Sequence, residues 1–226
     1  MNCYITPLPK NVDRIDISIE GFDNVFDWRD RYCIFYDWYV GNKHHWLIPN
    51  VIEFIKNIGE IEGFKINENF EYVSVPVLLN KTLMNKKITD IKFKGVFEVH
   101  NYSNNFISKG NYDILRWNKD TKWYPKEMFT EYHSSFYGSH SVSTTLNKSA
   151  DNKNSIIVIS DSMCIGFAKV LINSFYKTTI IDSRHFNVDK LNDLFNINEY
   201  DFKFVLFTQG RKNDVLKYYN KIIGKI

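Results

Sequence analysis

Glycine and proline are scarce in this sequence. Only 10 glycines and 5 prolines occur among 226 residues, about half the usual share of these two residue types. Their scarcity excludes collagen-like, linker-like and low-complexity chains. Cysteine is scarce as well, and its three positions, Cys3, Cys33 and Cys164, lie far apart without a C-x-x-C pair. We therefore expect neither a disulfide framework nor a structural zinc site.

Long apolar runs and a strong excess of charge are also missing. No uninterrupted apolar run approaches the roughly 18 residues that a membrane span requires. The N-terminus has neither the basic segment nor the long apolar segment of a signal peptide. On this basis we expect a cytoplasmic chain without a membrane span. The net charge of +3 is too weak to indicate a nucleic-acid partner.

The sequence is instead rich in apolar and aromatic residues. Hydrophobic residues make up 44% of it and aromatic residues 16%, which is typical of a globular chain and excludes a disordered one. The length suits one domain over residues 1–226. Within it, residues of about 64–140 alternate apolar and polar side chains, which predicts an inserted, mainly antiparallel β region.

The last third of the chain carries the clearest pattern. Three continuous apolar runs are typical of strands covered on both faces, and helical spacing of apolar residues follows each run. The runs lie at 156–159, 178–181 and 202–207, and the helical stretches at about 163–176, at 188–195 and from 212 onward. This alternation predicts a three-layer, flavodoxin-like α/β fold around a parallel sheet, in which sites lie at the carboxyl ends of strands.

The earlier parts of the chain give weaker predictions. Residues 3–8 predict a strand, and residues 32–36 predict a buried one. A helix is predicted from Pro49, which suits the first helical position, to Gly59, a residue type that often follows the last turn. Residues 138–154 are polar and predict a loop.

Ser162 is the first candidate for chemistry. It follows a predicted strand and stands next to Asp161, where a helix begins. The N–H groups and the dipole of a helix start favour negative charge, so this serine suits an acyl nucleophile with a nearby base. Asp and Ser are also favoured helix caps, which is the simpler interpretation. The sequence has no G-x-S-x-G elbow, which disfavours an ordinary α/β-hydrolase.

Two further motifs follow or precede predicted elements. His44 and His45 stand before Trp46 and the helix from Pro49, and histidine is the usual general base near neutral pH. Adjacent histidines on a strand point to opposite sides, so we expect at most one to face a site. Arg184 follows the second strand of the parallel set and suits a carboxylate or an oxyanion. The alternative for the two histidines is an exposed loop, and the alternative for Arg184 is a surface salt bridge. The remaining histidines show no metal-ligand spacing.

Taken together, these pieces resemble the SGNH-type hydrolases and O-acetyltransferases. The resemblance is strongest to the circularly permuted branch related to alginate O-acetyltransferases and DHHW-motif proteins, in which the acid–histidine motif precedes the serine. It rests on an apolar strand, Asp161-Ser162, a helix, a strand, Asp182-x-Arg184, a helix and a strand, in that order. It also rests on residues 39–46 (YVGNKHHW), which resemble a Y-x-x-x-D-x-H-W stretch, on residues 5–10 (ITPLPK) and on the glycine-containing loop 136–139.

The resemblance implies roles at the matching positions. Ser162 would be the nucleophile and His45 its general base, while Arg184 and Trp46 would bind the substrate or the tetrahedral oxyanion. The implied reaction moves an acetyl group onto a polysaccharide hydroxyl or hydrolyses such an ester. The partners of the protein would be a polysaccharide and an acyl donor. We expect no cofactor, no metal and a monomeric chain. Relatives are normally exported or held at the cell envelope, so the resemblance implies such a location and either a truncated start or a degenerate member here.

The sequence departs from the branch in ways that leave its function open. Lys43 stands at the branch's acid position, where it cannot accept the imidazole N–H and opposes the charge of an imidazolium. Asp37 is the nearest upstream acid, and the orienting acid is otherwise unknown; Ser160 replaces the usual glycine. The alternatives are an inactive domain that binds glycans through its Trp and Tyr residues, and a nucleic-acid module built on the basic segments 86–94 and 212–225.

Overall fold

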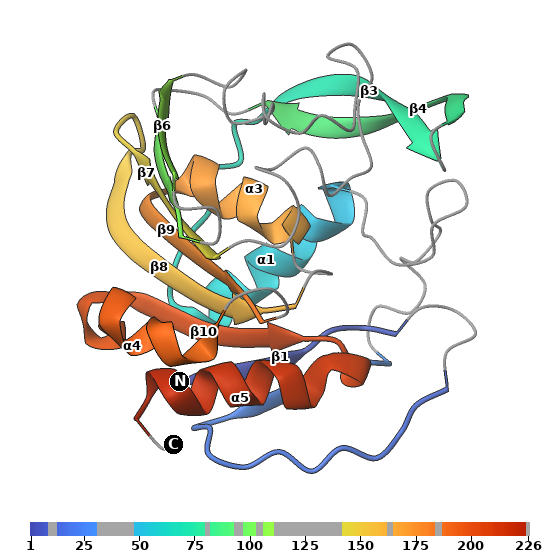
Figure 1. Cartoon of the computed structure of the whole chain (residues 1–226). Coiled ribbons are helices and arrows are strands. Elements are labelled where there is room, and N and C mark those ends of the chain that lie inside the picture. Colours follow the sequence, from blue (N-terminus) through green and yellow to red (C-terminus); the bar gives the residue numbers. More distant parts are fainter. Residues whose placement is uncertain are drawn as a thin grey trace.

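The computed structural model describes most of the chain: residues 1–8, 13–30, 48–79, 82–92, 97–102, 106–110, 142–161, 165–183 and 187–224. An eight-stranded sheet in the order β2-β1-β10-β8-β9-β7-β5-β6 forms its centre (Figure 1). These strands are β1 (Asn2–Ile5), β2 (Val25–Asp27), β5 (Phe97–Asn101), β6 (Phe106–Gly110), β7 (Val142–Asn147), β8 (Asn152–Ser160), β9 (Phe175–Asp182) and β10 (Phe202–Phe207). The helices are α1 (Ile48–Glu62), α3 (Ile165–Ser174), α4 (Leu191–Leu194) and α5 (Lys212–Ile222), with short 3-10 turns at Val188–Lys190, Ile197–Glu199 and Gln209–Arg211.

The central part of the sheet is parallel, as the sequence predicts. β8 pairs in parallel with β9 on one side and with β10 on the other, and β10 pairs in parallel with β1. β7 is antiparallel to β9, and β5 and β6 continue the sheet in antiparallel fashion. The predicted α/β fold with a mostly parallel sheet is therefore confirmed.

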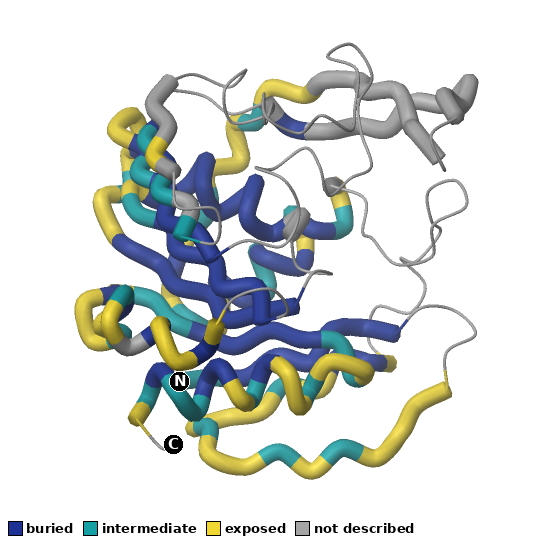
Figure 2. Tube along the Cα trace, in the orientation of Figure 1, coloured by how far each residue is buried: buried dark blue, intermediate teal, exposed yellow. Residues whose placement is uncertain are grey.

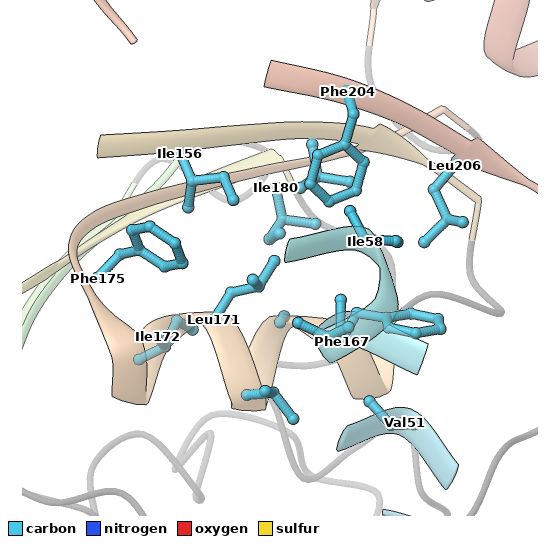
Figure 3. Packing of buried hydrophobic residues seen from close by; sticks show 14 of the residues in the cluster. Val51, Ile58, Ile156, Phe167, Leu171, Ile172, Phe175, Ile180, Phe204 and Leu206 are labelled. Carbon is cyan, nitrogen blue, oxygen red and sulfur yellow. The ribbon is translucent and has the colours of Figure 1, made fainter. Parts of the chain in front are cut away.

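Two apolar layers cover the two faces of this sheet. Ile156 and Val158 of β8 face α1 and α3, whereas the alternating residues Ile157 and Ile159 face α4 and α5. Figure 3 shows the first layer, in which Phe204 of β10 and other sheet residues point toward the two helices. In Figure 2 the central strands of the sheet and the described part of α3 are mostly buried, while α5 alternates buried and exposed residues as a surface helix does.

The helix α1 runs opposite to the strands, from their carboxyl ends to their amino ends. Near its start, the ring of Phe54 lies 5.3 Å from the ring of Phe167 in the first turn of α3. Beyond its end, the ring of Phe64 lies 5.3 Å from that of Phe202, which begins β10. The starts of α1 and α3 therefore lie at the same edge of the sheet, where the parallel strands end.

Two local predictions are wrong. Gly59 does not end the first helix: Gly63, with φ of 83°, ends it, and the N–H groups of Gly63 and Phe64 both donate to the Gly59 carbonyl. Residues 142–147 of the predicted polar loop form β7, a mostly buried strand in which β-branched threonines pair with β9. Residues 32–36, a predicted strand, lie outside the described residues.

A separate two-stranded sheet stands apart from the main one. It consists of β3 (Glu71–Leu79) and β4 (Thr82–Lys92), which pair in antiparallel fashion (Figure 1). The buried Ile91 of β4 belongs to the core layer of α1 and α3. The antiparallel character predicted for this part of the chain is confirmed, whereas its division as an insertion of about 64–140 stays a prediction.

Candidate functional site

The carboxyl edge of the parallel strands gathers the polar residues of the site. After β8 comes Asp161, after β9 comes Ser183, and after β10 comes Thr208. The chain leaves β8 through α3 on one face of the sheet and leaves β10 through α5 on the other face. Open α/β sheets bind ligands at such switch points, where neighbouring strands send their connections to opposite sides.

Asp161 joins the ends of β8 and β10. Its side chain is fully buried, and its Oδ2 accepts hydrogen bonds from the backbone N of Thr208 at 2.8 Å and from Thr208 Oγ1 at 2.9 Å. A buried carboxylate needs such donors, because burial without them is costly. The residue that precedes Ser162 is thus bonded across the switch point to the neighbouring strand.

The end of β9 adds a second buried carboxylate. Asp182 is 2% exposed and pairs in register with Ser160, and the N–H of Ser183 donates to the Ser160 carbonyl at 2.9 Å. Within the described part of the chain, the buried Ser183 Oγ has no hydrogen-bond partner. Two acidic side chains and a hydroxyl therefore flank the last residues of β8.

A buried arginine that the sequence analysis missed organises the rest of this edge. Arg29, 4% exposed, donates to Asp27 with two nitrogens, at 2.8 Å from Nε and 2.6 Å from Nη2. Its Nη1 donates to the Ile15 carbonyl at 2.5 Å and to Gln209 Oε1 at 3.1 Å. The hydrogen bonds from Arg29 hold the pKa of Asp27 below its ordinary value. Because the guanidinium is occupied in this way, it is a structural group at this edge.

The sequence gives little warning of this network. Asp27, Arg29 and Gln209 belong to no motif, and they come from two strand ends 180 residues apart. The only available signal is position: Gln209 follows a predicted strand of the parallel set, where polar side chains reach the edge. Arg211, two residues on, lies in the turn before α5, and its Nη1 is 3.3 Å from Asp214 Oδ2.

The start of α1 is fixed at the same edge. Trp28 follows β2, donates its backbone N–H to the Ile5 carbonyl at 3.1 Å, and packs its ring 4.8 Å from that of Phe54. Phe54 in turn packs on Phe167 of α3. This chain of aromatic contacts holds the beginnings of α1 and α3 together beside the ends of β1 and β2.

The residues that the sequence analysis assigned to the site lie outside the described residues. They are Ser162, His45, Trp46, Arg184, Asp37 and Lys43. The nearest described residues in the sequence are Asp161 and Ile165 on either side of Ser162, Ile48 after His45, and Ser183 before Arg184. All four lie at the carboxyl edge.

Other kinds of site find no support in the described part of the chain. It holds no group of three or more His, Cys, Asp or Glu residues able to bind a metal ion. None of its helices has both the length and the apolar character to cross a membrane. Burial raises the pKa of the Cys3 thiol to about 12, so this cysteine is a packing residue of the sheet.

The mostly parallel sheet with helices on both faces forms a three-layer α/β fold, which is consistent with an SGNH-like fold. The chain is similar to PatB1 from Bacillus cereus, with a TM-score of 0.58, 15% identity, and coverage of 83% of this chain and 70% of that one. A structure of Bacillus cereus PatB1 with a sulfonyl adduct has a TM-score of 0.57 and 14% identity, and the match covers 83% of this chain and 68% of that one. A DHHW family protein from Eubacterium siraeum has a TM-score of 0.60 and 12% identity, and the match covers 99% of this chain and 81% of that one. No protein-family model matches the chain, and no curated protein matches its sequence.

Proposed function

We propose that this protein is an acyl-transfer enzyme of the SGNH and PatB-like group, with Ser162 as its nucleophile and His45 as its general base. The observation that carries the proposal is the hydrogen-bonded pair of the buried Asp161 and the half-buried Thr208. It secures the residue before Ser162 at the switch point of the sheet, between the end of β8 and the start of α3.

The chemistry follows from that position. A serine between a strand end and a helix start is met by the free N–H groups of the first helical turn, which stabilise the oxyanion of a tetrahedral intermediate. Histidine supplies the base, since a serine hydroxyl is a weak nucleophile on its own. His45 precedes Ile48 by three residues in the sequence, and the aromatic contacts of Phe54 with Trp28 and Phe167 hold the start of α1 at this edge.

For the substrate we propose an acetyl ester or acetyl donor and a polysaccharide hydroxyl. Similarity in fold to PatB1 supports this class. The adduct in one PatB1 structure is a sulfonyl group. Arg184, next to the described Ser183, would bind the oxyanion or an anionic group of the substrate, and Trp46 would pack on a sugar ring.

The nucleic-acid alternative loses one of its two basic segments. In α5 the residues Val215, Tyr218, Tyr219 and Ile222 are buried against the sheet, which leaves the lysines on the outer side as on any amphipathic surface helix. Lys221 also lies 3.4 Å from Asp189. We therefore keep the carbohydrate substrate and propose no nucleic-acid partner.

The experiment is hydrolysis of p-nitrophenyl acetate by the wild type, by Ser162→Ala and by Ser149→Ala as a matched control. Ser149 is exposed in the turn between β7 and β8, at the opposite edge of the sheet. We expect the wild type and Ser149→Ala to hydrolyse the ester equally fast, and Ser162→Ala to lose at least about 99% of the rate. Equal rates for all three proteins would contradict the assignment of Ser162.

One observation favours a second function, a glycan-binding domain without activity. Lys43 stands where an acid would orient His45, so the imidazole lacks that partner from its own motif. If the domain is inactive for this reason, Lys43→Asp should create ester hydrolysis that the wild type lacks. A wild type that already turns over, and that slows when Lys43 becomes Asp, rules this second function out.

A further inference from the structure

We propose that Asp161 and Thr208 act as a positioning pair that sets the orientation of Ser162, beyond their contribution to folding. The inference deepens the proposed function and rests on Ser162 being the nucleophile. Asp161 and Thr208 are positioning residues in this account, because they act through the serine.

The geometry is that of a two-point attachment. A single carboxylate oxygen of Asp161 accepts both the backbone N–H and the hydroxyl of Thr208, at 2.8 and 2.9 Å. Two hydrogen bonds to the same residue fix the direction of the Asp161 side chain as well as its distance from β10. Asp161, the last described residue before Ser162, is therefore held in place at the end of β8.

The other side of the attachment is itself held firmly. Gln209, which follows Thr208, donates from Nε2 to the Asp13 carbonyl at 2.6 Å and accepts from Arg29 Nη1. Arg29 is bonded to Asp27 at the end of β2. Two groups of hydrogen bonds thus lie along the carboxyl edge from β2 to β10, and the peptide bond between Thr208 and Gln209 connects them.

The opposite edge of the same strand pair carries an attachment with the same two donors to one carboxylate oxygen, although this carboxylate is exposed. There Asp201 Oδ2, just before β10, accepts the backbone N–H of Ser155 at 2.7 Å and its hydroxyl at 2.8 Å. These hydrogen bonds from Ser155 lower the pKa of Asp201. Because both attachments join β8 to β10 through one carboxylate oxygen, the pair at the amino edge is a matched control far from Ser162.

The test compares Thr208→Val with Ser155→Ala, since each removes one hydroxyl donor and leaves the backbone N–H. The first measurement is the rate at which phenylmethanesulfonyl fluoride modifies Ser162, with peptide mass mapping to identify the modified residue. The others are kcat and KM for p-nitrophenyl acetate and the stability of each variant in urea. We expect both variants to lose stability, and Thr208→Val to lose more, because Asp161 is buried and Asp201 is exposed. We expect Thr208→Val to slow modification and kcat at least about tenfold with little change in KM, since small misplacements of reacting groups are costly.

We expect Ser155→Ala to stay within about twofold of the wild type in both rates, and Thr208→Ser, which keeps the hydroxyl, to restore them. Thr208→Ala serves in place of Thr208→Val if the valine variant does not fold. If the wild type reacts at Ser162 and the Thr208 and Ser155 variants slow it equally, the pair has a structural role only and the inference is wrong. If Ser162 of the wild type does not react at all, the proposed function itself fails, which is a distinct result.

Discussion

At the scale of single residues, the carboxyl edge depends on one buried cation. Arg29 uses Nε, Nη1 and Nη2 for hydrogen bonds, and its partners come from three separate parts of the chain. Arg14 contributes a second, more exposed ion pair to the same carboxylate, with Nη2 at 2.8 Å from Asp27 Oδ2, and also bonds to Asp30. The two arginines thus offer a direct comparison of a buried and a surface ion pair.

We predict that Arg29→Met lowers the free energy of unfolding at pH 7 by about 3 kcal/mol, because it leaves a partly buried carboxylate and two backbone or amide acceptors without their donor. Arg14→Met, at a side chain that is 47% exposed, should cost less than about 1 kcal/mol. Urea unfolding of the three proteins measures both values. Equal effects of the two substitutions would contradict the structural role given to Arg29.

The same variants carry a prediction about pH. Arg29 depresses the pKa of Asp27 in the folded state below the unfolded value of about 3.9. The contribution of this pair is therefore complete above that value, and it is lost as the pH falls through the folded-state pKa. The difference in stability between wild type and Arg29→Met should be constant from pH 7 to about 5 and should shrink below pH 4. A difference that stays constant down to pH 2 would contradict the assignment.

At the scale of elements, α1 depends on a close approach near its end. A Cβ built on Gly59 would lie 2.5 Å from the carbonyl oxygen of Phe64, a backbone atom that cannot move aside cheaply. The ring of Phe64 packs against Phe175 and Phe202, so the segment after α1 is held by the core. Position 59 therefore requires glycine because a larger side chain has no room, whereas position 63 favours glycine because its backbone is left-handed.

We predict that Gly59→Ala destabilises the protein by about 1 to 3 kcal/mol, since an overpacked site must shift the backbone or the ring of Phe64. Gly210→Ala is the control, because a Cβ at Gly210 has no atom within 4 Å among its neighbours. Thermal and urea unfolding should show the loss only for Gly59→Ala. An unchanged stability of this variant would mean that the end of α1 adapts freely.

Much of the element pattern follows from the sequence, and the exceptions have physical reasons. β8, β9, β10 and α5 are predictable because parallel strands are covered on both faces and a surface helix keeps an apolar stripe. β7 escapes prediction because Ser143, Thr144 and Thr145 are polar in composition, yet they are buried by pairing with β9. The hydrogen bonds between Thr144 and Thr179 and between Thr179 and Tyr200 show how that burial is accommodated.

The site follows from the sequence only in part. Asp161 and Ser183 are expected at the carboxyl edge, because they follow two predicted parallel strands. The bond from Asp161 to Thr208 and the Arg29 network are not predictable, since they depend on the strand order that places β10 between β1 and β8. Strand order is a property of long-range packing, and no local pattern encodes it.

At the scale of the whole molecule, the proposed site combines two segments that lie far apart in the sequence. The segment before α1 holds His45, and the segment between β8 and α3 holds Ser162. The core layer of α1 and α3, shown in Figure 3, brings the starts of these two helices to one edge of the sheet. The central claim is that the serine and the histidine work as one site at that edge.

The rate of sulfonylation of Ser162 by phenylmethanesulfonyl fluoride, compared between wild type and His45→Ala, tests this claim most directly. Peptide mass mapping identifies the modified residue, and His44→Ala is the control because it changes the adjacent imidazole only. We predict modification of Ser162 in the wild type and in His44→Ala, and a rate at least about 100-fold lower in His45→Ala, because a general base contributes that much or more. Equal rates in the two histidine variants, or modification at another residue, would contradict the account.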